Sequence, residues 1–370
     1  MARIPRLVIV WLSCCGIPLP ALHATSYSLT DLGNLPGGDN SSFAWCINNN
    51  GQVAGYSTIA DGYHAFLWTN NLMIDLGDLP GGGNYSDARC VNLRGQVVGT
   101  GWAATGNRAF LWDGGTMTDL GDLPGGDNES EAHGINLTCQ VVGSSKAATG
   151  TRAFRWDNGT MIDLGDLPGG EDNSQATGIN DRGQIVGCSG TPHGWRAFLW
   201  EDGAMLDLGA LSASGQSTAY DINELGQAVG WSSTSNGTHA FLWDEGMMLD
   251  LNNSTNVFDE ATAFAINDFG DVVGSGSTTS SPSQAFLYDS QAGMLNLNEL
   301  LDDSGNGWDL RYAFGINNRG QIVGYGSSPE YPNRAFLLTP IPEPMSIALL
   351  MLGGMIGLRI QRARRVSWDC

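Results

Sequence analysis

The chain of 370 residues carries 38 acidic against 17 basic side chains, which gives a formal net charge of −21. An acidic surface of this kind repels phosphate backbones and therefore argues against a nucleic-acid partner. With 52 glycines and only short apolar runs, the sequence disfavours long helices and favours many short strands joined by turns. The composition thus predicts an all-β fold.

The first 24 residues have the pattern of a secretory signal peptide. Two arginines precede an apolar run at residues 7–12, and a segment of small residues ends at Ala24 before a polar start. We expect cleavage after Ala24 and export through the inner membrane. Acylation of Cys14 or Cys15, as in a lipoprotein, is the alternative.

Behind this segment a unit of roughly 44 residues recurs seven times. Its Asp-Leu-Gly element, which degrades in the last two copies, starts at Asp31, Asp75, Asp119, Asp163, Asp207, Asp250 and Asn296. An asparagine after Ile or Val recurs at Asn48, Asn92, Asn136, Asn180, Asn223, Asn267 and Asn317. An Ala-Phe pair recurs seven times as well. Copies of one supersecondary unit therefore fill residues 25–340.

These repeats resemble the HAF family of extracellular repeats, over about Tyr27 to Leu338. The segments His64-Ala-Phe66 and His239-Ala-Phe241 match the three letters that give the family its name. The resemblance implies an exported location and implies no chemistry. The fold prediction therefore rests on the residues themselves.

Each repeat contains four strand-like segments, called strands a to d, which in the second repeat cover residues 88–92, 96–99, 109–112 and 117–121. The motif Asn-x-x-Gly between strands a and b suits a type I turn followed by a left-handed residue. An Asp-Gly or Asn-Gly pair between strands c and d predicts a second hairpin. Two hairpins make one four-stranded sheet.

Strands b and c are apolar on both faces, as in Ala197-Phe-Leu-Trp200, so each sheet needs an apolar cover on both sides. Neighbouring copies supply that cover in a β-propeller. The chain opens with an isolated strand d at residues 27–33 and closes with strands a to c at residues 313–338, so the first strand can complete the last blade. We predict a closed seven-bladed β-propeller; a β-solenoid or a string of separate sheets is the alternative.

The residue before Ala-Phe is basic in most repeats, and it faces the aspartate of Asp-Leu-Gly diagonally across the c–d hairpin. Where Gln284 replaces the basic residue, the partner Asn296 is neutral as well. Because the pair is repeated around the chain, we predict a structural role rather than a catalytic one. The predicted pairs are Arg108 with Asp119, Arg152 with Asp163, Arg196 with Asp207, and Arg334 with Asp31.

Positions that vary between copies of a constant frame are candidates for function. Strand a, expected nearest to the central channel, carries such a variable side chain at Trp45, Arg89, His133, Thr177, Tyr220, Phe264 and Phe314. Asp87 and Glu131 stand two residues earlier in adjacent repeats, so we predict a polar ligand-binding patch of Asp87, Arg89, Glu131 and His133. The alternative is a merely solvated charged face, with Phe264 and Phe314 packing between blades.

The loops between strands b and c are a second candidate region, because their lengths vary on an otherwise constant scaffold. We place Trp102, Trp195 and Trp231 in these loops, where their broad apolar faces suit stacking on sugar rings. Folding of each tryptophan back over its own blade is the alternative.

The connection from strand d to strand a reads Leu-Pro-Gly-Gly in the first four repeats and lies on the same predicted face. Its carboxylates would form an acidic arc that suits Ca²⁺, made of Asp78, Asp122, Asp127, Asp166, Glu171 and Asp172. The spacing matches no complete calcium loop, and Pro-Gly-Gly also serves as plain turn chemistry, so the sequence demands no cofactor. No C-x-x-C spacing marks a metal site, and the sequence assigns no disulfide pairing.

The last segment, residues 341–370, contains a Pro-Glu-Pro motif, then a hydrophobic helix expected from Met345 to Leu358, then a basic tail. Its elements are Pro342, Glu343, Pro344, Arg359, Arg362, Arg364 and Arg365. This order resembles the PEP-CTERM sorting signal of bacterial surface proteins. The resemblance implies transient insertion into the inner membrane, recognition by an exosortase and removal of the helix. A plain transmembrane anchor held by the arginines is the alternative.

Together these features predict an exported cell-surface or extracellular-matrix protein that binds exopolysaccharide or another surface polymer without catalysis. A propeller enzyme, a glycan hydrolase or lyase, is the first alternative. The sequence shows no Ser/His/Asp motif, metal triad or convincing carboxylate pair, although propeller enzymes gather catalytic groups from distant blades. A purely structural or adhesive role is the second alternative.

Overall fold

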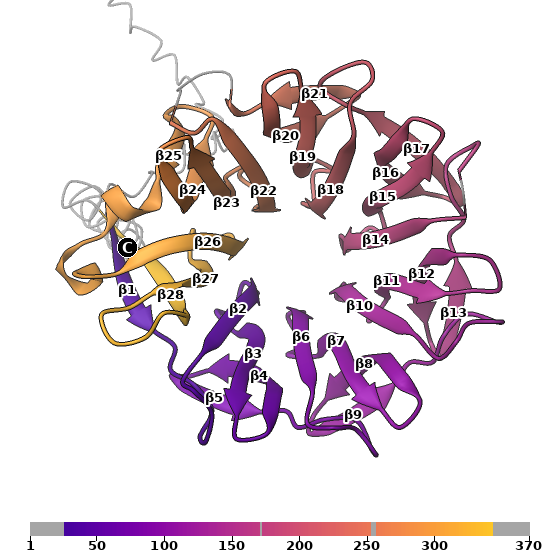
Figure 1. The fold of residues 1–370 in the computed structure, drawn as a ribbon, viewed down its shortest axis with the longest axis horizontal. Coiled ribbons are helices and arrows are strands. Elements are labelled where there is room, and N and C mark those ends of the chain that lie inside the picture. Colours follow the sequence, from indigo (N-terminus) through magenta and orange to yellow (C-terminus); the bar gives the residue numbers. More distant parts are fainter. Residues whose placement is uncertain (1–25, 171, 253–256, 343–370) are drawn as a thin grey trace, which may run out of the picture. The chain divides into compact units, whose positions relative to one another are not determined.

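The computed structural model describes residues 26–170, 172–252 and 257–342. They form seven four-stranded antiparallel sheets, which surround a common axis as blades (Figure 1). Helix among these residues is limited to two 3-10 turns, η2 (Leu297–Leu300) and η3 (Asp303–Gly305). The predicted all-β, seven-bladed propeller of four-stranded repeats is confirmed.

In each blade strand a lies nearest the axis and strand d lies outermost (Figure 1). The strands a are β2 (Ser42–Ile47), β6 (Ser86–Val91), β10 (Ser130–Ile135), β14 (Ser174–Ile179), β18 (Ser217–Ile222), β22 (Glu260–Ile266) and β26 (Asp309–Ile316). The strands b are β3 (Val53–Ile59), β7 (Val97–Ala103), β11 (Val141–Lys146), β15 (Ile185–Thr191), β19 (Ala228–Thr234), β23 (Val272–Thr278) and β27 (Ile322–Ser327).

The outer half of each blade is built from strands c and d. The strands c are β4 (Gly62–Thr69), β8 (Gly106–Asp113), β12 (Thr151–Asp157), β16 (Gly194–Glu201), β20 (Gly237–Asp244), β24 (Ser281–Asp289) and β28 (Arg334–Ile341). The strands d are β5 (Leu72–Asp75), β9 (Thr116–Asp119), β13 (Thr160–Asp163), β17 (Ala204–Gly209), β21 (Met247–Asp250), β25 (Gly293–Asn296) and, for the last blade, β1 (Ser26–Asp31).

The first strand of the propeller closes the ring. β1 pairs antiparallel with β28, from Ser26 opposite Ile341 to Asp31 opposite Phe336, and the last sheet has the order β1-β28-β27-β26. Arg334 Nε donates to both carboxylate oxygens of Asp31, at 2.8 and 3.0 Å. The closure predicted from the isolated first strand is therefore present.

The hydrophobic core lies between blades rather than inside them. One cluster joins Ala54 and Leu67 of one blade to Ala88, Val97 and Phe110 of the next. The phenylalanine of every Ala-Phe pair is fully buried, and burial of such a side chain stabilises the fold by about 1.5 to 3 kcal/mol. These residues are Phe66, Phe110, Phe154, Phe198, Phe241, Phe286 and Phe336.

A glycine in each strand b allows strand a to pack closely against it. A Cβ atom added to Gly99 would lie 1.9 Å from the carbonyl oxygen of Asp87. The equivalent contact is equally short in the other blades, so no larger residue fits at this position. The seven glycines are Gly55, Gly99, Gly143, Gly187, Gly230, Gly274 and Gly324.

The Asp-Leu-Gly element is a tight turn that connects three strands. Asp119 Oδ1 accepts from Gly121 N at 2.8 Å, and Gly121 has a φ of +83°, which glycine adopts without strain. The Gly121 carbonyl accepts from Ser130 Oγ at 2.6 Å, and Ser130 Oγ accepts from Ala109 N at 3.0 Å. The serine was not predicted from the repeat, although it recurs at Ser42, Ser86, Ser130, Ser174 and Ser217.

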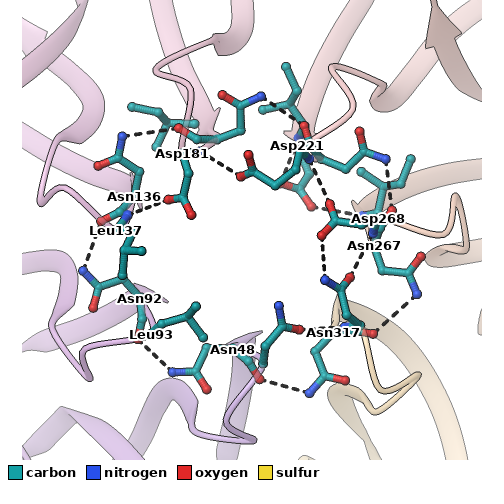
Figure 2. A pocket seen from close by; sticks show the side chains of 18 of the residues that line it. Asn48, Asn92, Leu93, Asn136, Leu137, Asp181, Asp221, Asn267, Asp268 and Asn317 are labelled. Carbon is teal, nitrogen blue, oxygen red and sulfur yellow. Dashed lines mark hydrogen bonds between the residues drawn. The ribbon is translucent and has the colours of Figure 1, made fainter.

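A closed ring of asparagines surrounds the axis (Figure 2). Asn48 caps its own turn, because its Oδ1 accepts from Asn50 N and Gln52 N, and Gly51 at the end of the turn has the expected positive φ of 80°. Each such asparagine also donates through Nδ2 to the backbone carbonyl of its counterpart in the next blade, at 2.8 to 3.4 Å. The turn motif therefore links all seven blades.

Both terminal segments fall outside the described residues. These are the signal peptide expected at residues 1–24 and the segment from Glu343 onward, which includes Pro344, Arg359, Arg362, Arg364 and Arg365. In the part of the chain that the structure describes, no helix has the length and apolarity needed to cross a bilayer.

Candidate functional site

Every inner strand carries a β-bulge at its variable position. The pairing of β6 with β7 passes from Ala88 to Cys90 and leaves Arg89 opposite no residue of β7. A bulge re-aims the side chain that it carries. In all seven blades the bulge residue lines one cavity on the axis, of about 160 Å³. These residues are Trp45, Arg89, His133, Thr177, Tyr220, Phe264 and Phe314.

The predicted polar patch consists of two side-chain pairs on the adjacent inner strands β6 and β10, and Arg89 and His133 of these pairs line the cavity. Asp87 accepts from Trp45 Nε1 at 2.8 Å, and its other oxygen is 2.8 Å from Arg89 Nη2. His133 Nε2 is 3.6 Å from Glu131 Oε2. His133 Nδ1 lies 2.8 Å from a backbone carbonyl of the next blade, which can only accept, so Nδ1 carries a proton.

The two carboxylates of the patch have environments that move their pKa values apart. Burial raises the pKa of Asp87 to about 6, although Arg89 and the Trp45 indole oppose this effect. The neighbouring His133 side chain lowers the pKa of Glu131. Two carboxyl groups whose pKa values are shifted in opposite directions therefore lie in adjacent blades.

The other side of the channel is aromatic. The ring centroids of Trp45 and Phe314 are 4.4 Å apart, and those of Phe264 and Phe314 are 4.7 Å apart. Tyr220 continues the contact, 5.5 Å from Phe264. Phe264 and Phe314 thus pack between blades, which agrees with the alternative given in the sequence analysis. They also line the channel.

From the channel a continuous series of ring contacts runs outward over three blades, and we call it the aromatic band. Successive centroids are 4.7 to 5.2 Å apart, within the range of favourable aromatic pairs. Trp102 at its outer end is 51% exposed, and the other members are partly exposed. The aromatic band consists of Trp102, Tyr85, Tyr63, Tyr56, Phe43, Tyr325 and Tyr312.

The placement of the three tryptophans in b–c loops is wrong. Strands b and c extend almost to the hairpin tip, and five of the seven b–c loops contain two residues, as at residues 104–105. Trp102 and Trp195 lie at strand ends, and Trp231 lies inside β19 opposite Ala240. Among the described residues only Trp102 of the three has a ring contact with the aromatic band.

The predicted basic-to-acidic pairs are present in three of the four named cases. Arg108 Nε is 3.1 Å from Asp119, and Arg152 Nε is 3.6 Å from Asp163. Arg334 pairs with the closing strand as described above. Histidine takes the same place in two other blades, and Asn296 donates to Gln284 at 3.0 Å in the sixth. These contacts join strands c and d within one blade, which is a structural role.

The pair of Arg196 with Asp207 is the exception. Arg196 donates instead to the Ala213 carbonyl at 3.3 Å, and within the described ranges it forms no ion pair. In the neighbouring blade Arg152 is held by a second carboxylate, Asp166, at 2.9 Å, but Ala210 stands at that place in this blade. The guanidinium therefore turns away from the c–d hairpin.

Several carboxylates of the predicted acidic arc already have protein partners. Asp122 and Asp166 are 2.8 and 2.9 Å from Arg108 and Arg152, and Asp172 is 3.1 Å from Arg152. Asp78 accepts from the backbone of its own loop, whereas Glu171 is outside the described residues. No group of three or more His, Cys, Asp or Glu side chains suited to a metal occurs in the described part. Calcium binding stays a prediction.

Acidic side chains that no sequence pattern singled out line the same pocket as the asparagine ring (Figure 2). Asp181 N donates to Glu224 at 2.8 Å, and Glu224 N donates to Asp268 at 2.9 Å. These residues line a cavity of about 200 Å³. Each of these acidic residues directly follows a repeated asparagine in the sequence. This position could have indicated the acidic cluster, because residues next to the asparagines meet around the axis.

No protein-family model matches the chain, and no curated protein does. Among solved structures it is similar to TolB from Acinetobacter baumannii, with 12% identity, a TM-score of 0.40, and 78% of this chain and 80% of that chain covered. It is also similar to AofleA from Arthrobotrys oligospora, with 14% identity, a TM-score of 0.38, and 73% of this chain and 88% of that chain covered. A third similar structure is a mutant of the Aleuria aurantia lectin AAL in complex with Fucα1-6GlcNAc. Its identity is 12% and its TM-score is 0.37, with 69% of this chain and 94% of that chain covered. At this level the likeness concerns the fold alone.

Proposed function

We propose that the protein is an exported, non-catalytic scaffold that binds extracellular polysaccharide along the aromatic band. The observation that carries this proposal is the contrast between two sets of aromatic residues. The phenylalanines of the Ala-Phe pairs are fully buried between blades, whereas every member of the band keeps contact with solvent. Partly exposed rings in an unbroken series form a surface on which successive sugar rings can stack.

Charge supports the same class of ligand. With a net charge of −21, the protein repels polyanions, so a neutral or weakly cationic glycan is the favoured partner. Asp87 and Arg89 of the polar patch contact Trp45, whose ring centroid is 6.4 Å from that of Phe43 in the band. The patch, which also includes Glu131 and His133, would supply hydrogen-bonding groups for sugar hydroxyls.

The test is retention of the purified protein on the exopolysaccharide of its own host. Trp102→Ala and Tyr85→Ala should each weaken binding by about tenfold, which corresponds to the loss of one stacking contact. Phe269→Ala is the matched control, because Phe269 is a 63% exposed aromatic residue in an a–b turn, outside the band. Undiminished binding by the band variants would reject this surface.

A glycan hydrolase is the second candidate, favoured by the separated pKa values of Asp87 and Glu131. A protonated carboxyl group and an ionised one are the pair that glycoside hydrolysis uses. Chain length of the polysaccharide after incubation distinguishes the candidates. Shortening by the wild type, absent in Asp87→Asn and Glu131→Gln, would replace the scaffold proposal with an enzymatic one.

Localisation forms part of the same proposal. Residues 1–24 would direct export, and the segment that begins at Pro342 would direct exosortase sorting to the surface, as the resemblance to HAF and PEP-CTERM sequences implies. Mass spectrometry of the mature protein tests both ends. Detection of Cys370 in the mature chain would favour the plain anchor.

A further inference from the structure

The residue that follows each bulge lies close to the neighbouring inner strand. A Cβ atom on Gly178 would lie 3.0 Å from the Tyr220 carbonyl oxygen, and one on Gly315 would lie 3.2 Å from Ile47 N. Small residues therefore occupy most of these positions, since neighbouring inner strands approach closely here. The seven residues are Cys46, Cys90, Gly134, Gly178, Asp221, Ala265 and Gly315.

Two adjacent members of this ring are cysteines. Cys46 Sγ of β2 and Cys90 Sγ of β6 are 3.2 Å apart, although they are 44 positions apart in the chain. Val91 N donates to Cys46 Sγ at 3.4 Å, which fixes the thiol against the neighbouring blade. Both cysteines are partly exposed and line the channel cavity.

We propose that Cys46 and Cys90 are an oxidation site, at which a disulfide covalently joins the first two blades at the axis. The inference stands apart from polysaccharide binding, because it rests on the two thiols alone. The other described cysteines, Cys139 and Cys188, are free thiols that have no cysteine partner among the described residues.

The reaction requires a disulfide reagent as oxidant. The Cys90 thiolate attacks one sulfur of an aliphatic disulfide, breaks its S–S bond, and releases the first thiol. Cys46 then attacks the sulfur of Cys90, forms the inter-blade bond, and releases the second thiol. Two protons and two electrons pass from the cysteines to the reagent. The hydrogen bond from Cys46 lowers the pKa of Cys90, which favours Cys90 as the first nucleophile.

The bond would restrict the unfolded chain by closing a loop between blades that are otherwise joined there by non-covalent contacts. Such cross-links stabilise a protein mainly by lowering the entropy of the unfolded state. Oxidation should therefore raise the midpoint of thermal unfolding, and reduction should lower it again.

The test uses the purified full chain treated with cystamine, a small aliphatic disulfide, followed by peptide mass spectrometry. We expect a cross-linked peptide pair that contains Cys46 and Cys90 with the loss of two hydrogen atoms, and a thermal midpoint several degrees higher. Dithiothreitol should reverse both changes. Because this comparison uses only the oxidised and reduced wild-type protein, its outcome does not depend on whether a variant folds.

Variants assign the effect to this pair. Cys46→Ser and Cys90→Ser should abolish the cross-link and the shift, whereas Cys139→Gly should retain both, because glycine stands at that turn position in all six other repeats. Separate cystamine adducts on the two cysteines, a cross-link to another cysteine, or unreacted thiols at both positions would each overturn the proposal.

Discussion

Asn317 in the last blade donates its side-chain amide to the backbone carbonyl of Asn48 in the first blade, at 3.0 Å. The two residues are 269 positions apart, and their contact completes the asparagine ring. The propeller is therefore closed twice, by β1 at the outer edge of the last blade and by asparagines at the axis.

We expect Asn317→Ala to destabilise the closed ring more than a surface substitution does. The change leaves the Arg319 and Gln321 amides without their acceptor and removes the bond to the first blade. Unsatisfied groups of this kind cost about 1 to 3 kcal/mol each, so the free energy of unfolding should fall by about 2 kcal/mol or more. Denaturant unfolding measures this change, with Asn306→Ala as the control, because Asn306 is exposed and has a φ of −56° that alanine adopts without strain. Equal values for the two variants would contradict the closing role.

The glycine of strand b offers a sharper test of packing. Gly99→Ala places a methyl group 1.9 Å from the Asp87 carbonyl oxygen, which neither strand can accommodate without moving apart. We expect a loss of more than about 3 kcal/mol or failure to fold. Gly101→Ala lies two residues further along β7, where the added atom meets only ordinary contacts at 3.5 Å or more. A tolerated Gly99→Ala would disprove this account of the repeat.

The sequence predicted the fold well because its signals are local and repeated. Asp-Leu-Gly and Asn-x-x-Gly each encode a turn through their own hydrogen bonds, and both recur at a constant spacing. The isolated first strand then indicated closure. Strand ends were less predictable, because the outer parts of strands b and c are polar. Trp231 was therefore assigned to a loop, although it lies within β19.

The candidate site was only partly predictable. Alignment of the repeats identified Arg89 as a variable position, and the polar patch was predicted from such positions. The β-bulge at this position was not predicted. The aromatic band could not be predicted, because Tyr63, Tyr85 and Tyr325 come from distant segments of the chain, and the band is complete only when three blades are assembled. The contact of Cys46 with Cys90 likewise depends on the spacing of neighbouring inner strands.

The exception at Arg196 predicts unequal effects of one substitution in two blades. Arg152→Ala removes contacts with Asp163, Asp166 and Asp172, from a side chain that is 15% exposed. We expect a loss of about 1 kcal/mol, since the carboxylates themselves remain partly solvated. Arg196→Ala, which removes one long hydrogen bond to a carbonyl, should change stability by less than about 0.5 kcal/mol. Equal losses in thermal or denaturant unfolding would contradict the difference between the blades.

The carboxyl group of Asp221 should make stability depend on pH. Burial raises its pKa to about 6 from 3.8, although the backbone amides of Ile266 and Ile222 donate to it. Because the folded state favours the protonated form, the stabilising contribution is complete below pH 3.8 and is lost as the pH rises through 6. A pKa difference of this size between the folded and unfolded chains corresponds to at most about 3 kcal/mol.

Asp221→Asn removes this titration and should flatten the dependence. The difference in unfolding free energy between variant and wild type should therefore move in favour of the variant between about pH 4 and about pH 7. The asparagine side chain also has one acceptor oxygen fewer than the carboxylate. This loss shifts the unfolding free energy by a constant amount and does not change its dependence on pH. Asp61→Asn, an exposed carboxyl group in the β3–β4 hairpin, serves as the control. A pH-independent difference for Asp221→Asn would show that this carboxyl group titrates equally in the folded and unfolded chains.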